Sequence, residues 1–276
     1  MIYSPLLIVI YGFIIFILSL ASAFDIKSRE VPDFISYVFL VGAILLILIL
    51  AIYEDSLQVL EFIPLSFALL FGFAYLMYRL GQWGGGDAKL MLGFSFLFTN
   101  ISLNSSLSFV NLFINMLLFG GFYGLFAILA LGVIKHKEMK QRMKIYDYVL
   151  LVAGAIAIIL VYFLIVYPLN ILISLMVLLL VVIRYIYIVS MELMYRDISV
   201  SKLTEGDWLA DDVIKDGKIV IRRTNIGLTA EDINKLKSEE VKQVRVKIGL
   251  PFIPGILLGA IVTIFFLNPV LSLFAL

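Results

Sequence analysis

Two aspartates stand where apolar segments meet charged ones, and both could take part in acid–base chemistry. Asp87 follows three glycines, Gly84, Gly85 and Gly86, and begins an apolar run. Asp25 ends the first apolar segment, just before a charged stretch. A carboxylate at membrane depth is costly, so it is by default a candidate for function. If both junctions lie on the same side of a membrane, the two carboxylates could hold one water between them.

Two carboxylates in one low-dielectric site do not easily ionise together, so the pair would hold a single proton. The ionised member then acts as a base toward water, and the protonated member hydrogen-bonds the oxygen of an attacked amide. This chemistry needs no metal and no covalent nucleophile. The chain has no cysteine and a single histidine, His136, so thiol chemistry and a His/Cys metal cluster are excluded. We therefore expect no metal and no other cofactor.

Both aspartates also have a purely structural explanation. Asp87 could cap the helix that follows the glycines, and Asp25 could pair with Arg29 one helical turn later. The glycines at 84–86 admit positive φ and close backbone approach, which would let an extended substrate segment reach Asp87. Arg29 and Lys89 could tune the two carboxylates, although their long side chains could equally reach solvent. The side of the membrane on which each junction lies decides between these explanations.

The composition is that of a polytopic membrane protein. Of the 276 residues, 63% are hydrophobic, and the mean hydropathy is +1.10, whereas soluble domains are roughly 45–50% apolar. A shorter apolar run at 87–99 would begin a helix inside the membrane. Runs of about 20 residues, enough to cross a bilayer, fall near 4–24, 34–53, 59–80, 107–134, 146–167, 169–194 and 251–274. We predict an all-α bundle of about eight transmembrane helices.

The positive charges test that count, because Lys and Arg concentrate in cytoplasmic loops. All but one of the 21 Lys and Arg residues fall in alternate loops, and the loops at 54–61, 100–106 and 168–170 contain none. This pattern predicts that both termini lie outside and that both aspartate junctions face the cytoplasm. The exception, Arg184, is expected to reach the interface or to pair with groups near Glu192 rather than to serve catalysis.

A small cytoplasmic α+β insertion is predicted at 195–249, between a helical bundle at 1–194 that carries the aspartates and a final transmembrane helix at 250–276. At this size the insertion is expected to rest on the bundle. Its expected elements are a hairpin of 208–214 and 218–223 around Asp216 and Gly217, a helix capped by Thr229, and a strand from Gln243 to Ile248.

The segment Gly84-Gly85-Gly86-Asp87 fits the G-x-G-D signature of intramembrane aspartyl proteases. Together with the charged stretch after Asp25 and with Lys89, it resembles the type IV prepilin peptidases, including the archaeal preflagellin peptidases. The resemblance covers about residues 20–93, and the stretch 251–255 is similar to the start of the family's terminal helix. It implies that Asp25 and Asp87 are the catalytic pair. It also implies removal of a short basic leader from prepilin or archaellin precursors at the cytoplasmic face of the cell membrane.

The resemblance also narrows the class of enzyme and its partners. Bacterial members often carry a four-cysteine zinc insertion, so a cysteine-free chain points to an archaeal-type enzyme that acts only as a peptidase. Presenilins share G-x-G-D but carry a Tyr-Asp pair and a Pro-Ala-Leu motif, which this chain lacks. The implied partners are pilin or archaellin precursors and membrane lipid, with no nucleic acid. The choice of precursor and the oligomeric state stay open.

A proton- or ion-coupled transporter is the alternative from another class, with Asp25 and Asp87 carrying protons and the glycines breaking a helix at the binding site. Such transporters are built from internal repeats around a site at the bilayer midplane. The chain has no convincing repeat, and both acids are predicted at one face. The peptidase interpretation is therefore preferred.

Overall fold

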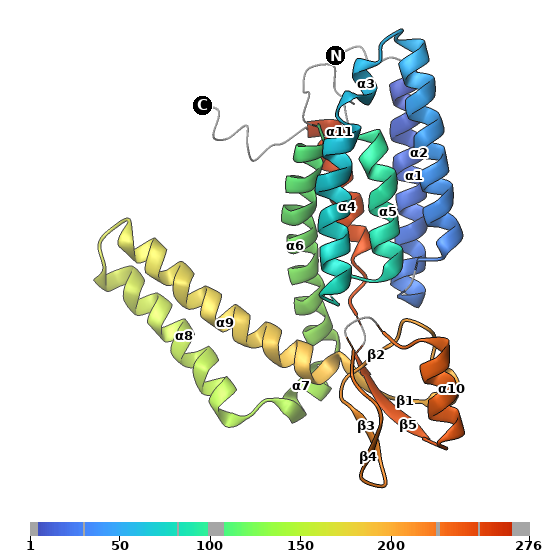
Figure 1. Ribbon diagram of the computed structural model, residues 1–276. Coiled ribbons are helices and arrows are strands. Elements are labelled where there is room, and N and C mark those ends of the chain that lie inside the picture. Colours follow the sequence, from blue (N-terminus) through green and yellow to red (C-terminus); the bar gives the residue numbers. More distant parts are fainter. Residues whose placement is uncertain are drawn as a thin grey trace.

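The computed structural model describes residues 5–29, 31–81, 83–98, 108–224, 227–247 and 249–266. Within these ranges the chain is mostly helical, and most of the helices form one bundle (Figure 1). The bundle contains α1 (Pro5–Ser28), α2 (Asp33–Tyr53), α3 (Gln58–Glu61), α4 (Ile63–Arg79), α5 (Gly85–Leu97), α6 (Ser108–Ile134) and α11 (Ile253–Phe266).

Five of the described helices are long and apolar enough to cross a membrane: α1, α2, α6, α8 (Ile145–Leu164) and α9 (Leu169–Leu193). Their outward faces carry large apolar side chains, such as Phe16 and Phe126, which are 66% and 71% exposed. Such faces are suited to lipid rather than to water. The chain is therefore an all-α membrane protein, as predicted.

The predicted helix at 59–80 is not continuous. The chain turns at Phe62, so that α3 has 4 residues and α4 has 17. Pro64 is the second residue of α4, a position where its missing N–H is tolerated, and this favours a new helix start there. Helix α5 is short, as expected, with 13 residues. Three of the eight predicted spans, in α4, α5 and α11, are thus shorter than a full span in the described residues.

The last described helix, α11, packs against both α1 and α6. The backbones of α6 and α11 approach closely, because a Cβ built on Gly255 would lie 2.8 Å from Cα of Gly120. A buried hydrogen bond from Asn115 Nδ2 to Thr263 Oγ1, 3.0 Å long, joins the same two helices. These contacts hold the first residue of α11 at the bundle end where α1 finishes and α5 begins (Figure 1).

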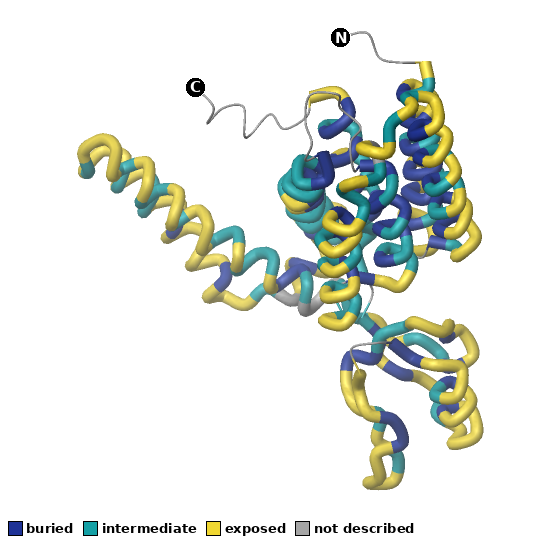
Figure 2. Tube along the Cα trace, turned by 45° about the horizontal axis from the view of Figure 1, so that its top comes forward, coloured by how far each residue is buried: buried dark blue, intermediate teal, exposed yellow. Residues whose placement is uncertain are grey.

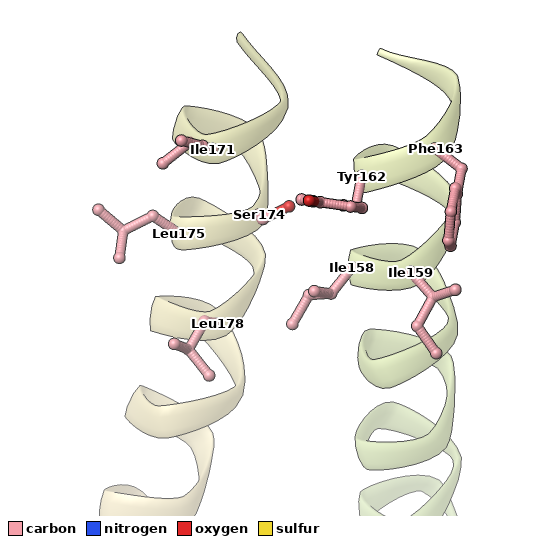
Figure 3. A pocket seen from close by; sticks show the side chains of 8 residues that line it. All are labelled: Ile158, Ile159, Tyr162, Phe163, Ile171, Ser174, Leu175 and Leu178. Atoms are coloured by element: carbon pink, nitrogen blue, oxygen red, sulfur yellow. The ribbon is translucent and has the colours of Figure 1, made fainter. Parts of the chain in front are cut away.

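Helices α8 and α9 form an antiparallel arm that leaves the bundle beyond α7 (His136–Arg142), as both whole-chain views show (Figures 1 and 2). Much of the arm is exposed and apolar. Gly154 lets α8 approach Val181 of α9, since a Cβ there would lie 2.7 Å from the valine side chain. A pocket of about 430 Å³ opens between the two helices (Figure 3), lined by Ile158, Ile159, Tyr162, Phe163, Ile171, Ser174, Leu175 and Leu178.

The segment after α9 folds into two small antiparallel sheets and one helix, at the bundle end that carries the start of α11 (Figure 1). One sheet has the order β1-β5-β2, and the other pairs β3 with β4. A separate apolar cluster, which includes Leu209, Leu236 and Val246, holds the segment together. The elements are β1 (Tyr195–Ser199), the 3-10 turn at Val200–Lys202, β2 (Trp208–Leu209), β3 (Val213–Lys215), β4 (Lys218–Ile221), α10 (Ala230–Ser238) and β5 (Gln243–Lys247).

Several local predictions for this segment are confirmed. Asp216 and Gly217 both have positive φ, 51° and 77°, and form the turn of the β3–β4 hairpin. The Thr229 hydroxyl accepts the N–H of Asp232 and caps α10. The expected first hairpin strand at 208–214 is in fact two strands. Strand β2 ends at Leu209 and pairs with β5 in the three-stranded sheet, and only β3 pairs with β4 in the hairpin. Strand β1 was missed.

Candidate active site

Asp25 lies in the last turn of α1 and is only 5% exposed. Its Oδ2 accepts the backbone N–H of Ile253 at 2.9 Å. The backbone of Phe252 also lies near this carboxylate and interacts with it. Because the Ile253 donor belongs to the N-terminus of α11, the partial positive charge of that helix end faces the carboxylate. Asp25, a residue of the first helix, is thereby bonded to the start of the last described helix.

Asp87 is the third residue of α5 and is half-buried. Its Oδ2 accepts the N–H of Gly84 at 3.1 Å. No hydrogen bond to its Oδ1 is found in the part of the chain that the structure describes. Asp87 and Asp25 lie close enough to interact directly through their charges. The fold therefore brings together two carboxylates that are 62 positions apart in the sequence, as the sequence interpretation required.

The glycines before Asp87 do not use positive φ, one of the two properties for which they were singled out. Gly84 precedes the helix with φ −72° and ψ 162°, and Gly85 and Gly86 are already helical, so none of the three uses positive φ. Gly86 does allow a close backbone approach, to a segment of this chain: a Cβ there would lie 3.0 Å from the carbonyl oxygen of Val31. This contact seats the start of α5 against the segment between α1 and α2.

The structural role considered for Asp87 is found in part, whereas the ion pair considered for Asp25 is not found. Asp87 does bond the backbone N–H of Gly84, but it is the third residue of the helix reaching back to the N-cap and is not the cap itself. Asp25 forms no ion pair with Arg29 among the described contacts. The Arg29 guanidinium donates instead to the carbonyl oxygen of Gly249. Neither explanation accounts for the meeting of the two carboxylates.

The two basic residues singled out beside the aspartates lie in different places. Arg29 has a positive φ of 63°, and its charge acts on Asp25 although its side chain binds Gly249. Lys89 Nζ pairs with Asp33 Oδ1 at 2.7 Å and lies 5.6 Å from the ring centre of Tyr37. Lys89 therefore links α5 to α2, whereas Arg29 links the end of α1 to the chain that leads into α11.

Three further groups belong to this neighbourhood and were not predicted. Tyr123 of α6 interacts electrostatically with Asp25, and its ring lies 3.3 Å from a Cβ built on Gly255. The buried Trp83 ring packs on Phe252, next to the N–H donor Ile253, with ring centroids 5.4 Å apart. From the sequence, the start of α11 is identified only by its similarity to the terminal helix of the family. Nothing in the sequence around Tyr123 indicates that this residue lies near Asp25.

Arg184 has a different partner from the predicted one. Its Nη2 lies 2.7 Å from Asp147 Oδ1, and Asp147 also accepts the N–H of Lys144. The guanidinium lies over the rings of Tyr146 and Tyr187, each about 5.2 Å away. The expectation that Arg184 pairs near Glu192 is therefore wrong, because the buried carboxylate of Asp147 in the neighbouring helix lies within ion-pair distance. This cluster stabilises the arm and is separate from Asp25 and Asp87.

Fold and site together define a membrane-embedded helical protein in which two aspartates from different helices meet at one end of the bundle. Residues 12–129 match the family model described as the type IV leader peptidase family. The matched range includes Asp25, Asp87 and Tyr123. This part of the chain is similar to that family of peptidases, as the sequence resemblance indicated. No curated protein and no solved structure matches the chain.

Proposed function

We propose that this chain is an aspartic endopeptidase that removes the short basic leader from precursors of the prepilin or archaellin type. The observation that carries the proposal is the meeting of Asp25 and Asp87 from two separate helices, with Asp25 held by the N–H of Ile253 that opens α11. The match of residues 12–129 to a leader peptidase family supports a precursor as the substrate.

The proposed mechanism uses one water and one shared proton. The carboxylate that is ionised removes a proton from the water, which attacks the amide carbon at the leader junction. The protonated carboxylate donates a hydrogen bond to the carbonyl oxygen as negative charge develops there. We assign the base to Asp25, because the N–H of Ile253 stabilises negative charge there, and the proton to Asp87. The product amine takes a proton from the pair as the C–N bond breaks.

The proposed orientation places this site at the cytoplasmic face, in an eight-span topology with both termini outside. The end of α1, the start of α5 and the start of α11 lie at one end of the bundle, together with α7 and the β-sheet segment (Figure 1). These elements hold most of the Lys and Arg residues, so the positive-inside rule supports a single cytoplasmic end. We further propose three functional parts, at 1–194, 195–249 and 250–276, because the second has an apolar cluster of its own.

The activity can be tested with the purified chain in lipid vesicles and a synthetic precursor that carries a basic leader before an apolar helix. We expect a single cut at the leader junction, identified by mass spectrometry of both products. A precursor with the same helix but no leader should stay intact. If no precursor is cut and a proton gradient across the vesicles dissipates instead, the transporter alternative replaces the proposal.

A further inference from the structure

The three-stranded sheet beside the candidate active site has one open edge. Its order, β1-β5-β2, makes β1 and β2 the outer strands. Strand β2 has only two residues, and the residues just before it bond to another segment: Gly206 N–H donates to Leu228 O at 2.9 Å and Leu228 N–H donates to Asp207 O at 2.8 Å. In the described ranges, no segment forms backbone hydrogen bonds to the outer side of β1, which we call the β1 edge.

The pairing register identifies the groups on the β1 edge. Arg196 lies opposite Val246, and the N–H of Val200 donates to Lys242 O in continuation of the same register. Antiparallel strands bond through alternate residues, so Arg196, Ile198 and Val200 face β5. The N–H and C=O groups of Tyr195, Asp197 and Ser199 consequently point outward. An outer strand with free groups of this kind is a template for another extended chain.

A short stretch of chain joins the start of the β1 edge to the Asp25 site. Tyr195, its first residue, lies opposite Lys247 at the end of β5. Six residues then lead from Lys247 to Ile253, whose N–H binds Asp25. An extended chain covers about 3.5 Å per residue, so these six residues reach at most about 21 Å. The contact of Arg29 with Gly249 ties the connecting chain to the end of α1.

The direction of β1 also fits a peptide that leads into the site. Strand β1 starts directly after the transmembrane helix α9 and runs away from it. A segment that precedes a peptide bond held at Asp25 and Asp87 would run the opposite way along the same edge. Its pairing with β1 would therefore be antiparallel, the commoner arrangement in sheets.

We propose that the β1 edge binds the leader of the precursor as an added antiparallel strand, with the leader junction delivered to Asp25 and Asp87. This inference rests on the proposed function and names where that function holds its substrate. Main-chain hydrogen bonds supply the affinity in such complexes, and side chains add specificity. The edge thereby accepts leaders of different sequence, provided that they can extend over about six residues.

The first experiment uses the unchanged protein and precursors in which one leader amide at a time carries an N-methyl group. Alternate residues of an added strand bond to β1, so KM is expected to rise about three- to tenfold at every second position, the effect of one lost hydrogen bond. The intervening positions should cleave with nearly the KM of the unmodified precursor. Equal KM values at all positions, or a rise without alternation, would overturn the inference.

The second experiment compares Asp197→Pro with Asp197→Ala. Position 197 points its N–H outward, so proline leaves the ladder with β5 intact and removes only the donor on the β1 edge. Relative to alanine, proline should raise KM about tenfold for a precursor with a full leader. The ratio should fall to one when the leader is cut to two residues.

The outcomes separate this inference from the proposed function. If the unchanged protein cuts no precursor, the proposed function fails first. If it cuts, and both position-197 variants have the same KM for the full leader, the leader does not pair with the β1 edge. If Asp197→Pro instead separates a dimer while cleavage is unaffected, the edge joins two copies of this chain and the inference is wrong.

Discussion

Asp25 Oδ2 accepts the N–H of Ile253 at 2.9 Å, and this bond joins two residues that are 228 positions apart in the sequence. It makes the start of α11 part of the candidate active site. It also places the carboxylate at a helix N-terminus, where negative charge is stabilised. The position of α11, set by its contacts with α6, thus decides how Asp25 is held.

Replacing Ile253 with proline should remove this donor while α11 still forms, because proline is tolerated at the first helical position. Hydrogen bonds to charged groups contribute about 1.5–3 kcal/mol, so kcat/KM should fall about 10- to 100-fold. Ile253 is fully buried, and Ile253→Ala controls for the loss of its side chain. Equal rates for the proline and alanine variants would show that the N–H of Ile253 is not needed.

Gly86→Ala and Gly85→Ala form a matched pair at the start of α5. The new methyl group at 86 would meet the Val31 carbonyl at 3.0 Å, whereas that at 85 would have Tyr78 as its nearest neighbour at 3.9 Å. The first substitution should displace Asp87 and cost about 1–3 kcal/mol of stability, and the second should be nearly neutral. Cleavage rate and melting temperature in detergent measure both effects. A similar loss in both variants would contradict the packing account.

The ion pair between Asp147 and Arg184 can be tested by a double-mutant cycle. Asp147→Asn or Arg184→Met alone leaves one charge without its partner and should destabilise the arm. The double substitution should cost less than the sum of the two. Because the chain has no cysteine, Val181→Cys provides a single reporter at the α8–α9 contact, and its labelling rate follows arm opening. If the effects of the two single substitutions on the logarithm of the labelling rate simply add in the double variant, the two side chains do not couple.

Acid should loosen α10 through Asp232. The pKa of this carboxyl is held below its usual value, because it accepts hydrogen bonds from the backbone N–H and the hydroxyl of Thr229. A depressed pKa in the folded state stabilises the helix above the unfolded pKa of about 3.9 and loses that effect as pH falls further. The protection factors of the α10 amides in hydrogen exchange, corrected for the intrinsic rate at each pH, should fall below about pH 4, and Asp232→Asn should remove that dependence. Glu231→Gln serves as the control and should retain it.

Sequence reasoning succeeded where the signal is local or set by hydrophobicity. Hydropathy indicated a bundle of apolar helices, and the side chains of Thr229 and Asp216 set the cap and the turn within a few residues. The alternation of charged loops was enough to expect Asp25 and Asp87 at one end of the bundle.

The rest depends on contacts between distant segments, which leave no local pattern. The donor to Asp25 is a backbone N–H in α11, and the partner of Arg184 lies across a helical hairpin. Strand β1 has five residues and directly follows a long helix, so neither its length nor its alternation separates it from α9. Its partner, β5, lies more than forty residues further along the chain.

The most direct test of the central claim compares the cleavage rates of Asp25→Asn, Asp87→Asn and the double variant, each checked for an unchanged fold. Amides keep the shape of the side chains but cannot share the proton. If the two carboxylates act on one water as a unit, each single substitution should lower kcat by about a thousandfold or more, and the double variant should be no slower than the singles. A single variant that cleaves at the wild-type rate, or losses that multiply in the double variant, would contradict the account.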